Sequence, residues 1–184
     1  MLKLYLDYRK KELYQFISSE IKKNTVQKIV QTVFVEGYLG KKQRFIKGHN
    51  YYLNITNKKP KLLKIENFMH TFKAKYGLSY IDTKYLNLLE KNKNEILSRI
   101  GTKPIEIFKK YFESIPTIRN GKIGQKKLTS FFTKLAHTVS PNKFVAMDNP
   151  IRKYFKLEDE SFMVSYDIIN ETFKDWIKKN KKLL

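Results

Sequence analysis

Apolar residues recur at helical spacing along most of the chain. Between residues 7 and about 31 they return every three or four positions, which is the period of an amphipathic α-helix and predicts one long helix or two short ones. The pattern as a whole predicts a mostly α-helical protein of about six to eight helices. The later helices are predicted over about 61–76, 83–99, 103–114 and 125–138, from Asp148 over a short stretch, and over 161–179.

Residues suited to helix ends support several of these boundaries. Asp82 directly precedes the helix predicted from residue 83, as an N-cap does, and Gly101 follows that helix at the C′ position. Thr102 precedes the next helix, which has Pro104 in its first turn. Asp148 fits an N-cap in the same way, because a short helix with proline in its first turn is predicted directly after it.

Two stretches break the helical period. Residues 32–56 hold β-branched and aromatic residues among three glycines, which predicts a loop or a small β-hairpin. Residues 115–124, with the sequence IPTIRNGKIG, are interpreted as a glycine turn between two helices. We expect a single domain, 1–184, in which 1–60 supply an N-terminal helix and a basic loop and 61–184 form the core.

The net charge of the chain predicts that this helical protein binds a polyanion. The chain carries 38 Lys and Arg against 17 Asp and Glu, a net charge of +21, and such a field attracts polyanions such as nucleic acid. Residues 41–75 hold ten basic residues and one acid, whereas 158–184 hold six acids against five lysines. A basic face is therefore expected, and the alternative is a lysine-rich composition that only solvates the surface. The candidate contacts in the first of these stretches are Lys41, Lys42 and Arg44.

Several classes of site are not expected from this sequence. It has no cysteine, and its three histidines are scattered, so disulfides and zinc sites are not predicted. Phosphate-binding glycine loops, the H-E-x-x-H pattern and the G-x-S-x-G pattern do not occur, and no cofactor is expected. With neither a signal peptide nor an apolar run of membrane-spanning length, we expect an intracellular monomer that does not enter a membrane.

Two glycines give the turn before the helix at 125–138 the outline of a helix-hairpin-helix element. A turn of this kind brings backbone N–H groups to the start of the second helix, where they and the helix dipole bind phosphate. The glycines are Gly121 and Gly124, and the nearby candidate contacts are Lys122, Gln125 and Lys134. The alternative is an ordinary pair of antiparallel helices with glycines in the turn.

The sequence IGQKKLTSFF followed by PNKFVAMD resembles the helix-hairpin-helix DNA glycosylase superfamily, and within it the 8-oxoguanine glycosylase branch. That family has a lysine at the start of a helix and, about twenty residues later, an apolar stretch that ends in a catalytic aspartate before another helix. Here Lys127 precedes Asp148 by 21 positions and Lys126 by 22. The resemblance implies a catalytic pair of one lysine with Asp148. An additional residue between the two glycines leaves the choice of lysine open, with Lys134 as a third candidate.

The expected function is the excision of a modified base from duplex DNA. A carboxylate would stabilise the positive charge that develops at the sugar, and a lysine amine would attack C1′, form a Schiff base and then nick the strand by β-elimination. Such an amine must be held in its neutral form by burial or by a neighbouring cation. The displaced base would need aromatic partners, and the aromatic residues nearby in sequence are Phe131, Phe132, Phe144, Tyr154 and Phe155.

Two alternatives from other classes stay open. The first is a non-catalytic basic protein that binds DNA or structured RNA, with a steep dependence on salt concentration. The second is a metal-dependent nuclease, for which Asp7, Glu20 and Lys22 form a D…E-x-K pattern. These three residues lie in a predicted helix rather than on paired strands, so the pattern is a weak indication.

Overall fold

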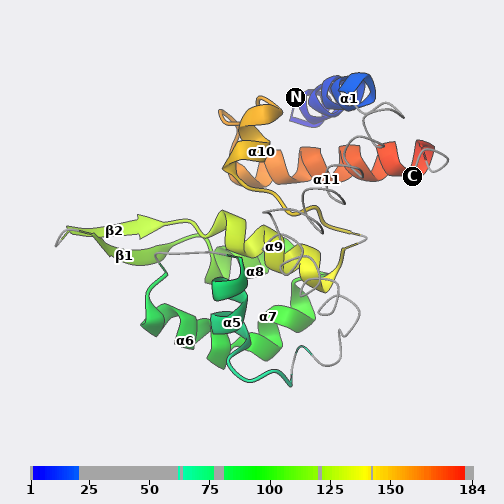
Figure 1. Cartoon of the computed structure of the whole chain (residues 1–184). Coiled ribbons are helices and arrows are strands. Elements are labelled where there is room, and N and C mark those ends of the chain that lie inside the picture. The colour runs from blue at the N-terminus through cyan, green and yellow to red at the C-terminus, as the bar shows by residue number, and fades with distance from the viewer. Residues whose placement is uncertain are drawn as a thin grey trace, which may run out of the picture. The chain divides into compact units, whose positions relative to one another are not determined.

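The computed structural model of the chain (Figure 1) describes residues 2–20, 62, 64–76, 81–119, 122–141 and 143–180. These residues are mostly α-helical, which confirms the predicted fold class. The β-hairpin or loop predicted over 32–56 lies outside the described residues, as do positions 21–31 of the first predicted helix.

The chain divides into two compact units, and each has its own helices. Unit 1 comprises Met1–Asn50 together with Asn149–Leu184, and unit 2 comprises Tyr51–Asp148. The organisation of the chain as one domain stays a prediction.

In the part that the structure describes, unit 2 consists of short helices and one β-hairpin. Asp82 caps the second of these helices as predicted, because its Oδ1 accepts a hydrogen bond from the backbone N–H of Lys84 at 2.6 Å. The helix predicted over 83–99 is divided at Asn92, whose side-chain amide donates to the carbonyl of Leu88. The elements are α5 (Phe68–Lys75), α6 (Thr83–Lys91), α7 (Lys93–Arg99), α8 (Pro104–Tyr111), β1 (Ile115–Arg119), β2 (Lys122–Lys126) and α9 (Thr129–Val139).

Phenylalanine rings fill the core of unit 2. The ring of Phe132 lies 5.0 Å from that of Phe108 and 5.6 Å from that of Phe112. The next residue toward the N-terminus of α9, Phe131, lies 5.2 Å from Phe72 and 5.8 Å from Phe112. All five side chains are buried. Because two consecutive residues of α9 are buried against α5 and α8 respectively, α9 is the central helix of this unit.

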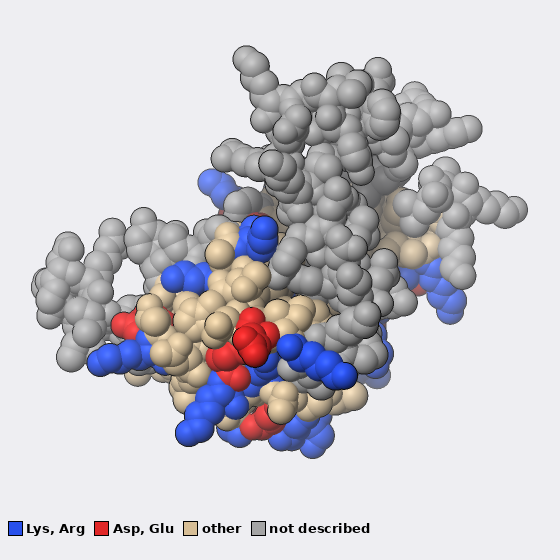
Figure 2. All heavy atoms as spheres, turned by 60° about the horizontal axis from the view of Figure 1, so that its bottom comes forward, with Lys and Arg blue, Asp and Glu red and all other residues tan. Residues whose placement is uncertain are grey.

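Ion pairs join the surfaces of α7 and α8. The carboxylate of Glu95 accepts from Arg99 at 3.2 Å, from Lys110 at 2.9 Å and from the Tyr111 hydroxyl at 2.6 Å, and Arg99 also pairs with Glu106. Figure 2, which brings the bottom of Figure 1 forward, shows acidic and basic side chains next to one another on the described part of that surface. Much of the basic charge on these helices is therefore balanced by neighbouring carboxylates.

Gly101, between α7 and α8, lies against the side chain of Ser140. A Cβ at this position would come 2.8 Å from Ser140 Oγ, which is closer than real Cβ atoms approach a neighbour. Its φ lies outside the left-handed region, so the position does not have the C′ conformation that the sequence predicts, and a larger residue here would require the Ser140 hydroxyl to rotate away.

Unit 1 is built from both ends of the chain. Helix α1 (Leu2–Glu20) packs beside α11 (Phe162–Lys179), and the short α10 (Asn149–Tyr154) precedes α11. Ser161 caps α11, because its hydroxyl accepts from the N–H of Val164 at 3.3 Å. The predicted helix over 161–179 is thus confirmed. The buried apolar residues of α1 and α11 are Leu13, Ile17, Phe162, Tyr166, Ile168, Ile169 and Trp176.

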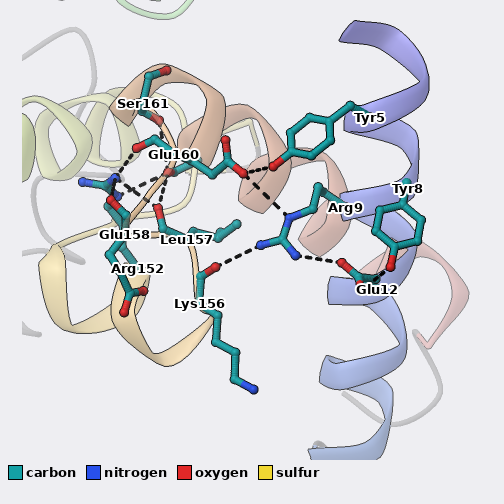
Figure 3. Close-up of polar contacts among 11 residues, drawn as sticks. Tyr5, Tyr8, Arg9, Glu12, Arg152, Lys156, Leu157, Glu158, Glu160 and Ser161 are labelled. Atoms are coloured by element: carbon teal, nitrogen blue, oxygen red, sulfur yellow. Dashed lines mark hydrogen bonds and ion pairs between the residues drawn. The ribbon is translucent and has the colours of Figure 1, made fainter. Parts of the chain in front are cut away.

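Arg152 organises the connection from α10 to α11 (Figure 3). Its Nη2 donates to the carbonyl oxygens of Leu157, Glu158 and Glu160 at 3.1, 3.3 and 2.6 Å, and its Nε donates to Ser165 Oγ at 3.3 Å. The carbonyl of Leu157 also accepts from the N–H of Glu160 and from the Ser165 hydroxyl, so the guanidinium and these local hydrogen bonds together satisfy the turn.

Helix α10 ends in a Schellman motif in which lysine takes the place of glycine. The N–H of Lys156 bonds to the carbonyl of Lys153 and the N–H of Leu157 to that of Arg152, while Lys156 has a φ of 52°. The carbonyl of Lys156 accepts a hydrogen bond from Arg9 Nη2 at 2.9 Å. The end of α10 is in this way joined to α1.

Arg9 is the centre of a second polar cluster, on α1 (Figure 3). Its Nη1 donates to Glu12 at 2.7 Å, and its Nε lies 3.8 Å from the carboxylate of Glu160, to which the Tyr5 hydroxyl also donates. Burial acts to lower the pKa of Arg9, but the hydrogen bond and the charge of Glu12 raise it overall. The guanidinium thus stays charged between two carboxylates.

Candidate nucleic-acid interface

A β-hairpin stands where the sequence analysis expects a glycine turn between two helices. Strands β1 and β2 pair antiparallel from Ile115 opposite Lys126 to Arg119 opposite Lys122. The prediction of a glycine turn over 115–124 was therefore wrong, and the helix-hairpin-helix element is not confirmed. Helix α9 begins at Thr129, so neither candidate lysine, 126 or 127, lies at the start of a helix.

The sequence contains a signal for this hairpin that the glycine-turn interpretation missed. The register leaves two residues, Asn120 and Gly121, between the paired positions. Asn-Gly is the preferred sequence of two-residue hairpin connections, because both positions require a positive φ. The flanking residues Ile115, Thr117 and Ile118 are β-branched and favour strands.

The base of the hairpin is fixed in the core of unit 2. Ile115, the first residue of β1, is 2% exposed, and Leu128, two residues after β2, is 6% exposed. The N–H of Leu128 donates to the carbonyl of Phe112 at 2.8 Å, which joins the two ends of the hairpin segment. Figure 1 shows β1 and β2 extending from this base away from the helices of unit 2.

The hairpin segment 115–127 carries only one sign of charge. Its sequence has four basic residues and no acidic residue. Arg119 and Lys122 are paired in the register at the end of the two strands that is far from the core. Lys127 is exposed, and its Nζ lies 3.5 Å from the carboxylate of Glu113, just before β1.

The exposure and partner of Lys127 do not favour a nucleophile. Its side chain is 60% exposed and forms an ion pair with Glu113, whereas the nucleophile that the resemblance implies is a desolvated amine without such a partner. Lys126 lies in β2, and its side chain is not described. The approach of Lys126 or Lys127 to Asp148 stays a prediction. The carboxylate that the structure places beside Lys127 is that of Glu113.

The segment before Asp148 is held along one side of α9. The N–H of Met147 donates to Thr133 Oγ1 at 3.1 Å, and the Thr133 hydroxyl donates to the carbonyl of Met147 at 2.5 Å. Closer to the end of α9, the His137 ring bonds through Nδ1 to the carbonyl of Phe144. Burial lowers the pKa of His137, which favours the neutral ring, and Nδ1 donates to this carbonyl.

Asp148 is half-buried and directly precedes α10. Its neighbour Met147 is 1% exposed, so the chain enters Asp148 from a fixed, buried position beside Thr133. Lys134, the third candidate lysine, is the residue after Thr133, and its ammonium lies 5.6 Å from the ring centre of Tyr76, a cation–π contact. The capping role of Asp148 stays a prediction.

Other predicted contacts divide between described and undescribed parts of the chain. Gln125 lies in β2 and is exposed. Lys122 and Gly124 also lie in β2, although only the backbone of these two is described. The predicted contacts outside the described residues are Gly121, Lys41, Lys42 and Arg44.

Neither a metal site nor a membrane segment is found in the described part of the chain. Among residues 2–20, 62, 64–76, 81–119, 122–141 and 143–180, no three His, Asp or Glu side chains gather closely enough to hold a metal ion. None of the described helices has the length and apolar character needed to cross a membrane.

Family models, curated proteins and solved structures each gave no match to this chain.

Proposed function

We propose that this protein binds duplex DNA by placing the β1–β2 hairpin in the major groove. The observation that carries the proposal is a hairpin fixed in the core at its base, with four basic residues and no acidic residue in segment 115–127. The major groove of B-DNA, about 12 Å wide and 8.5 Å deep, admits a two-stranded β-ribbon. A strand of five residues spans about 17 Å, which is enough to reach the floor of the groove.

Charge distribution favours the hairpin over the helical surface of unit 2. On α7 and α8 the basic side chains of Arg99 and Lys110 already pair with Glu95 and Glu106. A phosphate would have to compete with these carboxylates there. In the hairpin segment Lys127 pairs with Glu113, at the base and not at the far end.

A charge-removal variant of the hairpin tests this proposal. For Arg119→Ala/Lys122→Ala/Lys126→Ala we expect about tenfold to hundredfold weaker binding to a fluorescein-labelled duplex at about 150 mM salt. The slope of log affinity against log salt should fall by about 0.9 for each phosphate that the variant no longer neutralises. Fluorescence anisotropy over about 50 to 200 mM salt measures both quantities.

A second triple variant of equal charge provides the control. Lys103→Ala/Lys109→Ala/Lys110→Ala also removes three positive charges, from α8 and the residue before it. Its effect on affinity should be well below that of the hairpin variant. Equal losses for the two variants would mean that only net charge matters and would refute the hairpin as the contact. Sedimentation of the protein–DNA complex measures whether the protein binds as the expected monomer. Localisation of the protein in cells tests whether it is intracellular, as expected.

Base excision is a second candidate function, supported by the position of Asp148. An apolar segment that lies along a helix and ends in an aspartate directly before another helix is what the glycosylase resemblance implies. In this reaction the lysine nitrogen bonds to C1′ as the C1′–N bond of the base breaks. The base leaves with the electron pair and gains a proton. The C1′–O4′ bond then breaks, O4′ takes up the proton that the lysine nitrogen loses, and the nitrogen lone pair forms the C1′=N bond of the Schiff base.

Borohydride trapping on duplexes with single modified bases tests the excision candidate. We expect a covalent adduct that Asp148→Asn reduces at least about a hundredfold, as removal of a charge-stabilising group does in other enzymes. The adduct should also be lost in one of Lys126→Ala, Lys127→Ala and Lys134→Ala. If no modified base gives either an adduct or an abasic product, excision is excluded and DNA binding alone stands.

A further inference from the structure

Unit 1 holds a cavity of about 210 Å³ that is lined by aromatic rings. Phe16 of α1, Tyr154 at the end of α10 and Phe155 contribute these rings. They contact one another edge to face, with centroid distances of 5.5 Å for Phe16–Tyr154, 6.0 Å for Phe16–Phe155 and 5.1 Å for Tyr154–Phe155. Leu13 and Leu157 line the cavity as well and are buried, so its inner part is apolar.

The rings are held in place by the contacts that join α1 to the end of α10. Arg9, which also lines the cavity, donates to the carbonyl of Lys156 next to Phe155. Phe155 packs further against Phe173 of α11 at 5.8 Å. Tyr154, in contrast, is 56% exposed although it is a large aromatic residue. The cavity thus has a fixed inner side and an exposed aromatic edge.

The polar end of the cavity still has hydrogen-bonding capacity. A guanidinium has five N–H donors, and Arg9 directs Nη1 to Glu12 and Nη2 to Lys156. Its Nε is buried and faces the carboxylate of Glu160 at 3.8 Å, so the donors left for a ligand are the second N–H groups of Nη1 and Nη2. A ligand that carries acceptor atoms on the edge of a flat ring could use these remaining donors, and Glu12 could accept from its amino groups.

Basic residues surround the aromatic ones in the sequence Arg152–Lys156, RKYFK. Arg152 is used within the protein, whereas Lys153 and Lys156 are exposed. Aromatic faces with lysines beside them are the combination that binds single-stranded nucleic acid, because bases stack on the rings and phosphates meet the ammonium groups. The size also fits, since a cavity of about 150 Å³ is known to hold one benzene ring.

We propose that this cavity takes up one unstacked base of a single-stranded nucleic acid. The base would lie against Tyr154 with its edge toward Arg9 and its flanking phosphates near Lys153 and Lys156. This site belongs to unit 1 and is separate from the hairpin, so it stands or fails independently of duplex binding.

The test compares two single strands of equal length and charge on the full chain. One is oligothymidylate, and the other has abasic sites in place of every thymidine. We expect the protein to bind oligothymidylate at least about tenfold more tightly, which is the usual size of one base–aromatic stacking contact. Equal affinity for the two strands would overturn the proposal.

Variants of Tyr154 test whether this cavity causes the difference in affinity between the two strands. Tyr154→Ala should bring the affinity for oligothymidylate down to that for the abasic strand and leave the abasic affinity unchanged, while Tyr154→Phe should keep the difference. Tyr14→Ala removes another tyrosine of unit 1, one that lies beneath Lys179 and not in this cavity, and should also keep it. If Tyr14→Ala and Tyr154→Ala act alike, the cavity is not the site. The hairpin variant should lower the affinity for both strands by the same factor and so keep the difference between them.

Discussion

Replacement of Phe132 by alanine should lower the free energy of unfolding by about 3–5 kcal/mol. The side chain is fully buried in α9, where its ring contacts Phe108 and Phe112. Alanine would leave a cavity between α8 and α9, and two rigid aromatic neighbours cannot close it. Denaturant unfolding followed by circular dichroism measures the loss, and hydrogen exchange should show the largest change in α8 and α9.

An exposed residue of the same region provides the control. Ile105 on α8 is 53% exposed, and Ile105→Ala should change stability by no more than about 0.5 kcal/mol. A loss below about 1 kcal/mol for Phe132→Ala would mean that α9 is not the central helix of unit 2.

Arg152→Ala should have the next largest effect, a loss of about 3 kcal/mol. The guanidinium donates to three backbone carbonyls and one serine hydroxyl, and hydrogen bonds from a charged donor contribute about 1.5–3 kcal/mol each, although not additively. Alanine would leave the carbonyls of Leu157 and Glu160 without this donor. Thermal and denaturant unfolding measure the loss, and amide exchange should increase most in residues 155–165.

Two neighbouring substitutions separate geometry from charge. Arg152→Lys keeps the positive charge but has a single nitrogen in place of the fork, so it should recover less than half of the loss. Lys153→Ala removes an exposed charge from the same helix and should stay within about 0.5 kcal/mol of the native protein. If Arg152→Lys is as stable as the native chain, charge and not hydrogen bonding holds the turn.

Local features of the fold could be predicted because they depend on neighbouring residues. The Asp82 cap accepts a hydrogen bond from the N–H two residues away, so a short sequence pattern contains it. Thr102, the predicted cap of the next helix, instead donates its hydroxyl to the carbonyl of Arg99, and Lys103 directly precedes α8. The division of the helix at Asn92 could not be read from the period, because apolar residues continue on both sides of it. The Asn120-Gly121 pair indicates a two-residue hairpin connection, but it was interpreted as part of a turn between two helices.

The candidate sites depend on contacts between distant residues, which sequence patterns do not contain. Asp148 was singled out correctly as a residue at a boundary, yet its position beside Thr133 comes from tertiary hydrogen bonds. The pair of Lys127 with Glu113 spans the whole hairpin. Tyr154 and Phe155 were candidates to hold a base, but Phe16, which completes the cavity with them, lies at the other end of the chain.

The composition of unit 1 from both ends of the chain affects how the protein is made. During synthesis on the ribosome, α1 emerges before α11, and the apolar side of α1, with Leu13 and Ile17, is not covered by α11 until that helix has been made. At about 5–20 residues per second, roughly 8 to 30 seconds pass before α11 has been translated. Unit 2 is a continuous stretch and can fold during that interval. A nascent chain interrupted before α11 would therefore present an uncovered α1 to chaperones and proteases, although its unit 2 is complete.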